Sequence, residues 1–258
     1  MNPRDARKII RQRTAPNLFD FSYVTTRAHL QAFRQFLVLL AKESKPMRII
    51  DVGCGYKPFL KLLRDLAIDK YIGVDFDTKR SAADVVASAD RLPFPDNSFD
   101  GVIATEVLEH TMHIEDAIRE IRRVARNGAL VYISTPFLLG EHGVPYDFQR
   151  LTRYWYLEMF KHDEILLLQG TNTSFAAPFF IANIVVENIA ALKTLPLIPE
   201  LIYVLNNVCA LAGEAAVKLM RVATAFIFRR KRAWATNIMD IYFGTMPGGL
   251  DVIVRIKK

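Results

Sequence analysis

One short stretch constrains the fold of this chain more than any other. Residues 48–52 form a run rich in β-branched residues, and Gly53 and Gly55 follow it one residue apart. Glycine permits a sharp turn and a close approach of the backbone to a ligand. Because Pro58 suits the first position of a helix, we predict a strand, a tight turn and a helix over 58–66. The free N–H groups at such a helix start face the same space as the turn, which favours a nucleotide-like ligand.

A second predicted strand ends in a carboxylate at a characteristic distance from the glycines. Residues 71–75 have a strand pattern that ends in Asp75, twenty residues beyond Gly55. Rossmann-like folds place an acidic residue about 20 residues after the glycine turn, where it binds a ribose. Asp77 is also near, but we prefer Asp75 because it ends the strand directly.

The remaining sequence alternates between strand and helix patterns. Candidate strands lie at 84–87, 99–105, 129–134, 164–169 and 251–256, and candidate helices lie at 28–42, 115–125 and 155–161. This alternation predicts an α/β, Rossmann-like fold whose mostly parallel sheet is covered on both faces. The first of these helices is amphipathic, and its apolar face carries Leu30, Phe33, Phe36, Leu37 and Leu40.

Length and composition predict one large α/β domain with additions. A chain of 258 residues that is 51% hydrophobic and 24% charged can bury a substantial core. We expect a basic arm and helical cap over 1–45, with the arm weakly structured over 1–17, and a cofactor-binding core over 46–170. A helical apolar insertion over 171–245 and the final strand of the core over 246–258 complete the predicted organisation.

The charge and hydropathy of the chain limit the classes of partner and the cellular location that we expect. The net charge of +7 is concentrated at 4–13 and 229–232, which suits an anionic partner, either nucleic acid or an acidic membrane surface. Cys54 and Cys209 have no disulfide or zinc-binding spacing, and the charged start is unlike a signal peptide, so a cytoplasmic location is expected. Charges within 175–232 interrupt any run of about 18 to 20 apolar residues, which disfavours a bilayer span. This segment is predicted to lie on a membrane, or to form a lid or dimer surface.

Four motifs in a fixed order resemble the class I S-adenosylmethionine-dependent methyltransferases of the type 11 group. They are DVGCG at 51–55, GVD at 73–75, LPFPDNSFD at 92–100 and EVLEH at 106–110. The resemblance implies a seven-stranded sheet with an antiparallel last strand, and it places the apolar insertion between the sixth and seventh strands. A further segment, with Pro136, Phe137, Glu141, His142 and PYDFQRLT at 145–152, is similar to a subgroup associated with saccharide, glycolipid or natural-product methylation.

The resemblance implies S-adenosylmethionine as cofactor and assigns it a set of residues. Gly53 and Gly55 would lie against its amino-acid part with Asp51 orienting the turn, and Asp75 would bind the ribose hydroxyls. Adenine would lie near Ser88, Ala89 or Asp90, because Ser88 stands where the family usually has an aspartate, and Glu106 opens the fourth motif and completes the predicted cofactor set. Lys57 replaces a common third glycine, which predicts a less snug turn.

Methyl transfer depends mainly on holding the acceptor in line with the methyl group, which can lower the activation barrier by about 7 to 11 kcal/mol. A hydroxyl acceptor gains a further factor of about 10² to 10⁴ from a general base. The candidates that follow strand ends are His110, His142 and Asp147. Alternatively, His110 could cap or pack the helix that follows it, and Asp147 could cap the segment that starts the helix after its own loop. No metal is expected, and the alternative is a divalent ion held by His142, Glu141 and Asp147. The histidines expected to be ordinary surface or core residues are His29, His113 and His162.

We therefore predict a methyltransferase that acts on a hydroxyl of a small molecule, a saccharide or a glycolipid. One alternative is an RNA methyltransferase anchored by the basic arm, although no recognisable RNA-binding module accompanies that arm. Another is a non-catalytic scaffold that binds a membrane or a partner protein through the insertion. A nicotinamide dehydrogenase is disfavoured because its G-x-G-x-x-G motif requires glycine where this chain has Pro58.

Overall fold

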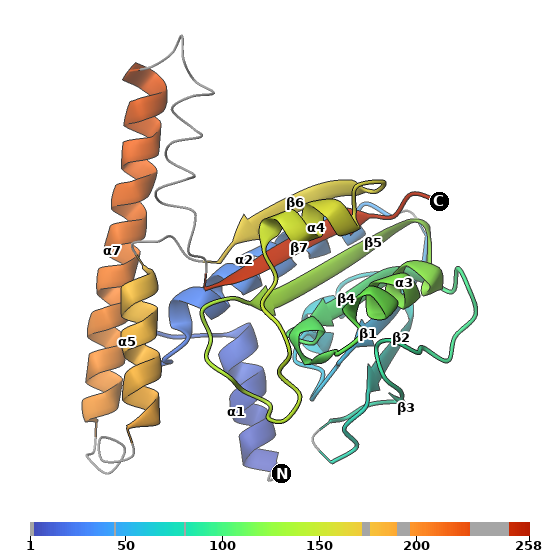
Figure 1. Cartoon of the computed structure of the whole chain (residues 1–258), viewed down its shortest axis with the longest axis horizontal. Coiled ribbons are helices and arrows are strands. Elements are labelled where there is room, and N and C mark those ends of the chain that lie inside the picture. Colours follow the sequence, from blue (N-terminus) through green and yellow to red (C-terminus); the bar gives the residue numbers. More distant parts are fainter. Residues whose placement is uncertain (1–2, 44, 80, 172–175, 190–196, 228–247) are drawn as a thin grey trace.

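The structure of the protein is a computed structural model that describes residues 3–43, 45–79, 81–171, 176–189, 197–227 and 248–258 (Figure 1). The helices are α1 (Pro3–Thr14), α2 (Tyr23–Leu40), α3 (Ile114–Val124), α4 (Arg153–Met159), α5 (Ala177–Asn188) and α7 (Ile198–Ile227). The strands are β1 (Met47–Val52), β2 (Ile68–Asp75), β3 (Val85–Val86), β4 (Phe99–Thr105), β5 (Ala125–Pro136), β6 (Glu164–Gly170) and β7 (Gly249–Arg255). Two short 3₁₀ turns are η1 (Leu60–Leu63) and η2 (Leu108–His110).

The strands form one seven-stranded sheet in the order β3-β2-β1-β4-β5-β7-β6. The first five strands in this order pair in parallel, whereas β7 is antiparallel to both β5 and β6. The predicted α/β, Rossmann-like class with an antiparallel last strand is therefore confirmed. Because parallel strands end at the same edge, the segments that follow β1, β2, β4 and β5 converge there.

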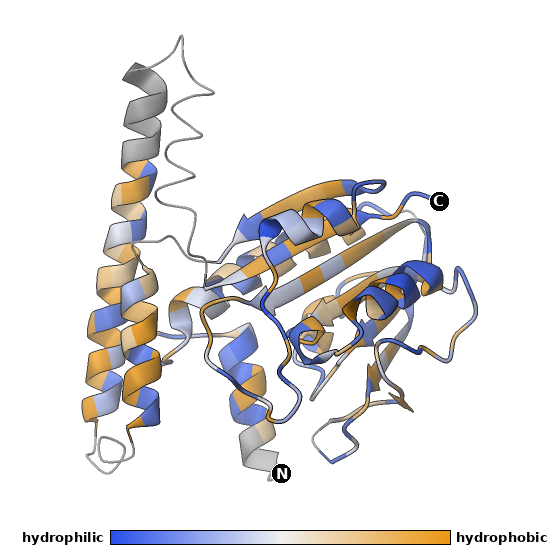
Figure 2. Cartoon of the chain, in the orientation of Figure 1, coloured by the Kyte–Doolittle hydropathy of each residue, from blue (hydrophilic) through white to orange (hydrophobic). Residues whose placement is uncertain are grey.

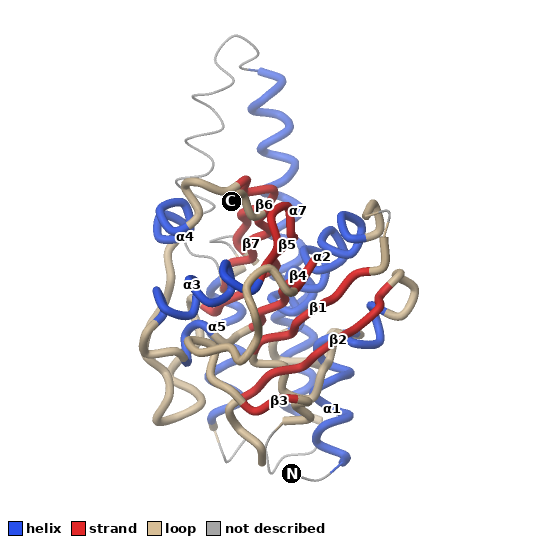
Figure 3. Tube along the Cα trace, turned by 90° about the vertical axis from the view of Figure 1, so that its right-hand side faces the viewer, coloured by secondary structure: helices blue, strands red, loops and turns tan. Residues whose placement is uncertain are grey.

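Helices cover both faces of the sheet, with α2 on one side and α3 and α4 on the other (Figure 3). Strand β5 is buried on both faces, and its side chains alternate between two apolar clusters. Val131 and Ile133 face one cluster, while Tyr132 packs with Phe33 of α2 at a ring distance of 5.2 Å. Phe33 also stacks on Phe59 at 4.3 Å, so α2 is fixed firmly against the strand ends.

The amino-terminal arm is helical, and the prediction of a weakly structured segment over 1–17 is wrong. Helix α1 is held to the following loop by Arg11, which is paired with the buried carboxylate of Asp20. Burial opposes ionisation of Asp20, but the hydrogen bonds from Arg11 and the Asn17 backbone outweigh it and lower the pKa of the carboxyl. A basic sequence therefore forms a helix here because its charge has a buried partner.

The helix predicted over 58–66 is also wrong, because only the four-residue turn η1 forms. Strand β2 begins at Ile68, three residues earlier than expected. The other predicted helices are confirmed to within a few residues, although α2 begins at Tyr23 rather than at 28. The predicted strand at 84–87 shortens to Val85–Val86.

The apolar insertion falls between β6 and β7, as predicted, and α5 and α7 pack side by side as a hairpin (Figures 1 and 2). Two buried amides attach this hairpin to the loop between α1 and α2. Asn183 donates to the Phe21 carbonyl at 2.9 Å, and Asn207 donates to the carbonyls of Leu18 and Asp20 at 2.8 and 3.0 Å. Residues 172–175, 190–196 and 228–247, including the basic run at 229–232, lie outside the described residues.

Helix α7 contains one stretch, Ile198–Leu219, that is long and apolar enough to cross a membrane by length and composition alone. This differs from the expectation, because Glu200 and Glu214 flank thirteen uncharged residues, and together with Lys218 they still leave the stretch apolar on average. A core helix of a soluble protein meets the same criterion, so the property alone does not identify a span. The hairpin nonetheless exposes large apolar side chains, namely Ile181, Val185, Leu201, Leu205, Val208 and Leu219.

Candidate active site

The turn after β1 has the backbone conformation that the glycines predicted. Gly53 and Gly55 have φ values of 68° and 48°, in the left-handed region that favours glycine. A Cβ atom on Gly53 would lie 2.5 Å from the Val107 side chain, whereas one on Gly55 would meet no atom within 4 Å. Gly53 is therefore required for packing, and Gly55 leaves room for a ligand to approach the backbone.

Asp75 at the end of β2 is fixed against this turn. Its Oδ2 atom accepts a hydrogen bond from the Gly55 backbone N–H at 2.9 Å, and its Oδ1 atom accepts one from the Asp77 N–H at the same distance. The predicted ribose-binding acid and the predicted glycine turn are thus directly connected.

Lys57 belongs to the glycine turn, but its side chain packs against β2. Its φ of 54° is the conformation that a glycine would take, at a cost of about 1 to 2 kcal/mol for another residue. The side chain extends over Gly73 and its ammonium group pairs with Asp84 at 2.6 Å. Lys57 thereby packs against β2, and a Cβ atom on Gly73 would collide with it at 2.5 Å.

Asp51 is almost completely buried beneath the same turn. Its Oδ2 atom accepts a hydrogen bond from Tyr71, and among the described residues its Oδ1 atom has no hydrogen-bond partner. Burial raises the pKa of Asp51 to about 7, against the effect of the Tyr71 hydrogen bond and with a further contribution from the charge of Asp75. The group can therefore change its charge near neutral pH.

The residues predicted for adenine lie in the loop after β3. Val86 is the register partner of Asp75, so Ser88, Ala89 and Asp90 follow close beside the ribose-binding acid. Ser88 is exposed, Ala89 is buried and Asp90 is half-buried. The contact with adenine stays a prediction for these three residues.

Glu106 lies at the end of β4 with a φ of 53°, which is uncommon outside glycine and often marks functional sites. It is anchored to β5, because its N–H donates to the Ser134 carbonyl at 2.9 Å and its Oε1 atom accepts from the Ser134 hydroxyl at 3.1 Å. Glu106 and Ser134 both line a cavity of about 320 Å³.

This cavity is bordered by α1, α2, α5 and the carboxyl ends of β4 and β5. Its apolar walls include Ile9, Phe21, Phe59, Leu139 and Phe180, and its polar lining includes Thr25, His29, Glu106 and Ser134. The combination of apolar walls and a few polar groups is typical of a small-molecule site.

A buried His–Asp pair faces this cavity, and the sequence analysis missed it. His29 Nδ1 lies 2.6 Å from Asp251 Oδ1, which also accepts a hydrogen bond from Tyr132 at 2.7 Å. The other ring nitrogen, Nε2, lies 3.9 Å from Glu106 Oε1. Burial disfavours the charged imidazole, but the Asp251 carboxylate outweighs burial and raises the pKa of His29.

Two sequence signals could have found this pair. His29 lies one turn before Phe33 on the sheet-facing side of α2, and Asp251 is the one charged residue within the apolar run 249–254 of β7. A buried carboxylate needs a partner. The partner is 222 residues away in the sequence, so short-range reasoning did not connect them.

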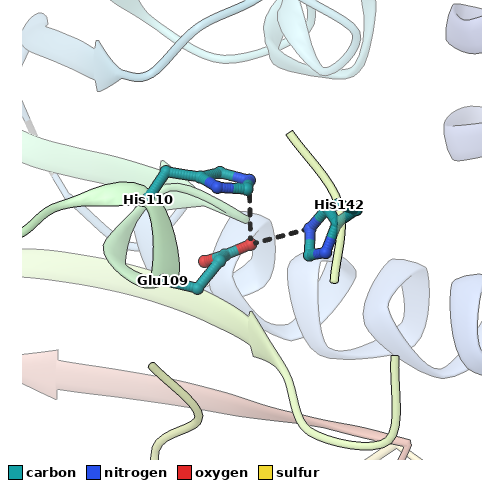
Figure 4. Close-up of side chains that lie close together, drawn as sticks. All are labelled: Glu109, His110 and His142. Carbon is teal, nitrogen blue, oxygen red and sulfur yellow. Dashed lines mark ion pairs between the residues drawn. The ribbon is translucent and has the colours of Figure 1, made fainter. Parts of the chain in front are cut away.

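The predicted bases His110 and His142 belong to a second cluster, around Glu109 (Figure 4). Both Nε2 atoms lie 3.7 Å from Glu109 Oε1, and the two imidazole rings are 4.8 Å apart. The Glu109 side chain is fully buried, and both of its oxygens lack a hydrogen-bond partner in the described part of the chain. Burial raises the pKa of Glu109, while the Glu109 carboxylate raises the pKa of His142.

Asp147 is held by hydrogen bonds from its neighbours. It accepts hydrogen bonds from Arg150 at 2.6 and 2.8 Å and from the His142 backbone N–H at 2.9 Å. The Arg150 guanidinium holds the pKa of Asp147 far below its usual range, which favours a positioning role over a general base. The alternative that Asp147 caps the next helix is wrong, because Thr152 caps α4, and Glu141 is exposed.

The loop 137–152 lies over the strand ends and contacts both the Glu109 cluster and the end of β2. The Phe148 N–H donates to the Glu109 carbonyl at 2.8 Å, and the Tyr146 ring contacts the Phe76 ring at 5.5 Å, next to Asp75. The predicted cofactor residues and the second histidine cluster therefore share one edge of the sheet with the His29 cavity.

Comparison with known proteins agrees with this geometry. Residues 50–133 match the family described as "Methyltransferase domain". A demethylmenaquinone methyltransferase from Roseiflexus sp. (strain RS-1) is 33% identical over 131 residues, covering 46% of this chain and 55% of the relative. The chain spans about half the length of the curated relatives that it matches.

Solved structures confirm the fold. An S-adenosylmethionine-dependent methyltransferase from Archaeoglobus fulgidus aligns with a TM-score of 0.51 at 14% identity, over 97% of this chain and 99% of the other. The [4+2]-cyclase SpnF aligns with a TM-score of 0.53 at 19% identity, over 88% of this chain and 82% of the other. The fold is therefore shared with a protein titled as a cyclase, so the fold alone does not define the reaction.

Replacing Asp51 by Asn is expected to remove a pH dependence of stability. The pKa of Asp51 is about 7 in the folded protein and near 3.8 when unfolded. The folded state therefore holds the proton more tightly, and the free energy of unfolding falls as pH rises from about 4 to 7, by up to about 1.4 kcal/mol per pH unit. Urea unfolding across this range should show the Asn variant gaining stability over wild type up to about pH 7, and then a constant difference. Asp69→Asn, an exposed change on β2, is the control, and parallel curves for Asp51→Asn and wild type would contradict the assignment.

Proposed function

Because residues 50–133 form a class I methyltransferase domain of the type 11 group, we propose that this protein transfers a methyl group from S-adenosylmethionine to an acceptor hydroxyl. The proposed acceptor is a small molecule, a saccharide or a glycolipid. The observation that carries the proposal is the His29–Asp251 pair, which faces a cavity that borders the predicted cofactor residues through Glu106.

We assign cofactor binding to the carboxyl ends of β1, β2, β3 and β4. Gly53 and Gly55 would admit the amino-acid part of the cofactor, and Asp75 would hold the ribose. Asp51 would orient the turn and Glu106 would close the site beside β5, while adenine would lie against Ser88, Ala89 or Asp90. The sulfonium of S-adenosylmethionine supplies an activated methyl group when bound, so the protein has to align an acceptor and exclude water.

The cavity supports an apolar acceptor that carries a hydroxyl. Its walls are mainly aromatic and aliphatic, and His29 Nε2 faces a lining that also holds Thr25 and Ser134. Asp251 holds the Nδ1 side of the ring, and the neutral imidazole can then accept a proton at Nε2. The relative named for demethylmenaquinone is consistent with an apolar acceptor.

The alternatives find less support. Helix α1, the basic arm of the RNA hypothesis, lines the cavity through Ile9, Gln12 and Arg13 and pairs Arg11 with Asp20. That helix therefore forms a wall of the cavity rather than a free anchor. The scaffold hypothesis gives no account of a His–Asp pair buried at the cavity.

We further propose that the α5–α7 hairpin rests on an anionic membrane surface. It exposes Leu201, Leu205 and Val208 along α7 and Ile181 and Val185 along α5. The sequence continues into the basic run at 229–232, which would favour anionic lipids. A glycolipid acceptor could then reach the cavity from the membrane, because Phe180 of α5 lines it.

Titration with S-adenosylhomocysteine tests the cofactor assignment. Wild type should bind with micromolar affinity, and Asp75→Asn should weaken binding tenfold or more, about 1.4 kcal/mol. Asparagine keeps an acceptor for the Gly55 N–H but weakens the paired hydrogen bonds to a ribose diol. Asp77→Asn should have a smaller effect. Absence of binding by folded wild type would refute the proposed function, and a larger effect from Asp77→Asn would reassign the ribose contact.

The His29 role is tested by titrating the imidazole by NMR and by measuring turnover with the first acceptor found. Asp251→Asn should lower the pKa of His29, because the raising carboxylate is removed, and should shift the acidic limb of the rate profile to lower pH. His29→Gln should reduce kcat by about 10² to 10⁴ while S-adenosylhomocysteine binding changes little. A kcat close to wild type in His29→Gln would exclude His29 as the base.

Co-sedimentation with vesicles tests the membrane proposal. Wild type should bind phosphatidylglycerol-containing vesicles at low salt, and Leu201→Glu/Leu205→Glu should abolish binding because the charges face the acyl region. The matched control is Val38→Glu/Tyr154→Glu, which alters equally exposed apolar residues on α2 and α4. Failure of wild type to bind would leave the hairpin as a lid or dimer surface.

A further inference from the structure

The cluster of Glu109, His110 and His142 is built around a carboxylate that has no hydrogen bond. Glu109 is fully buried on η2, and neither of its oxygens finds a donor among the described residues. A buried, ionised carboxylate without hydrogen bonds is strongly destabilising unless a positive charge accompanies it. The Nε2 atoms of His110 and His142 each lie 3.7 Å from Glu109 Oε1, which is too long for a hydrogen bond.

The hydrogen-bond partner of Nδ1 on each ring determines whether Nε2 of that ring carries a proton or a lone pair. His110 Nδ1 contacts the Tyr146 carbonyl, and His142 Nδ1 contacts the Gly140 carbonyl at 3.1 Å. A carbonyl can only accept, so each Nδ1 carries the proton and each neutral ring presents a lone pair at Nε2. Both imidazoles therefore turn a lone pair toward the Glu109 carboxylate, and Figure 4 shows the three side chains gathered around that group.

This convergence matches the ligand set of a divalent transition ion. Metal–nitrogen and metal–oxygen bonds to Zn²⁺ are about 2.0 to 2.2 Å, so two ligands of one ion lie about 3 to 4 Å apart. The candidate ligand atoms of the three residues all lie within 4.8 Å of one another, so a bound ion would draw the widest pair closer together. Two imidazoles and one carboxylate suit Zn²⁺, Co²⁺ or Fe²⁺ rather than Mg²⁺ or Ca²⁺, which prefer oxygen ligands.

We propose that Glu109, His110 and His142 bind one divalent first-row transition ion, with Zn²⁺ as the reference ligand. Asp147 and the carbonyls of Gly140 and Tyr146 would orient the two imidazoles through Nδ1, as partners of metal-bound histidines commonly do. This site differs from the set His142, Glu141 and Asp147 considered from the sequence, because Glu109 replaces both acids.

The ion would connect two segments that are far apart in the chain. Glu109 and His110 follow β4, whereas His142 belongs to the loop 137–152 that lies over the strand ends. Three protein ligands leave at least one coordination position for water or for an acceptor oxygen. The site would therefore fix the loop and place a Lewis acid at the edge that holds the predicted cofactor residues.

Calorimetric titration of chelator-treated, dialysed protein with ZnCl₂ tests the proposal. Wild type should bind one ion per chain with micromolar or tighter affinity, and Co²⁺ should give visible d–d bands typical of nitrogen and oxygen ligands. Glu109→Gln should weaken Zn²⁺ binding by about 100-fold or more. In the absence of metal this variant should be at least as stable as wild type, since it replaces an unpaired buried carboxylate by a neutral amide.

Two controls separate the cluster from adventitious binding. His113→Ala/His162→Ala removes the two exposed histidines and should retain wild-type affinity. His142→Gln is a second ligand variant and should lose Zn²⁺ if Glu109→Gln does not fold. No stoichiometric binding by folded wild type, or unchanged affinity in the ligand variants, would overturn the metal site and leave a protonated His142 as the partner of Glu109.

Discussion

The insertion of β7 between β5 and β6 is the constraint on which the site depends. The last strand of the chain is antiparallel to both neighbours, and it carries Asp251 to the same edge where β1, β2, β4 and β5 end. There Asp251 meets His29, from the second helix of the chain. The imidazole of His29 is therefore oriented only when β7 has paired with β5 and β6, because β7 carries Asp251.

Three buried acids lie near the edge of the sheet where the parallel strands end. Asp51, Glu109 and Asp251 are each buried, and each has at least one carboxylate oxygen without a hydrogen bond among the described residues. Burial of acids is tolerated when cations are close. Asp251 has His29, and the proposed sulfonium cofactor and transition ion would provide positive charge on the same edge of the sheet. An electrostatic preference for cationic ligands would then be a property of the fold at this edge.

Sequence patterns predicted those parts of the site that are local in the chain. The glycine turn, Asp75 and the β-α alternation depend on contacts within about twenty residues, and the structure places them as expected. The His29–Asp251 pair and the contact of Glu109 with His142 depend on distant segments that meet only in the folded sheet. The arm over 1–17 was misjudged for the same reason, since the buried Asp20 that neutralises Arg11 is not evident from composition. The short η1 turn replaces the helix predicted over 58–66, and β2 begins three residues earlier than expected.

The anchoring of the hairpin gives the cavity a mechanical connection to the outer surface. Phe180 forms part of the cavity wall, and Asn183, one helical turn further along α5, is bonded to the loop that joins α1 and α2, both of which also form walls. A displacement of the hairpin therefore acts on three walls together, through a pair of buried amides rather than through a flexible tether. Binding of the hairpin to another surface would therefore change the width of the cavity. By the same coupling, a molecule that fills the cavity would change the affinity of the hairpin for that surface.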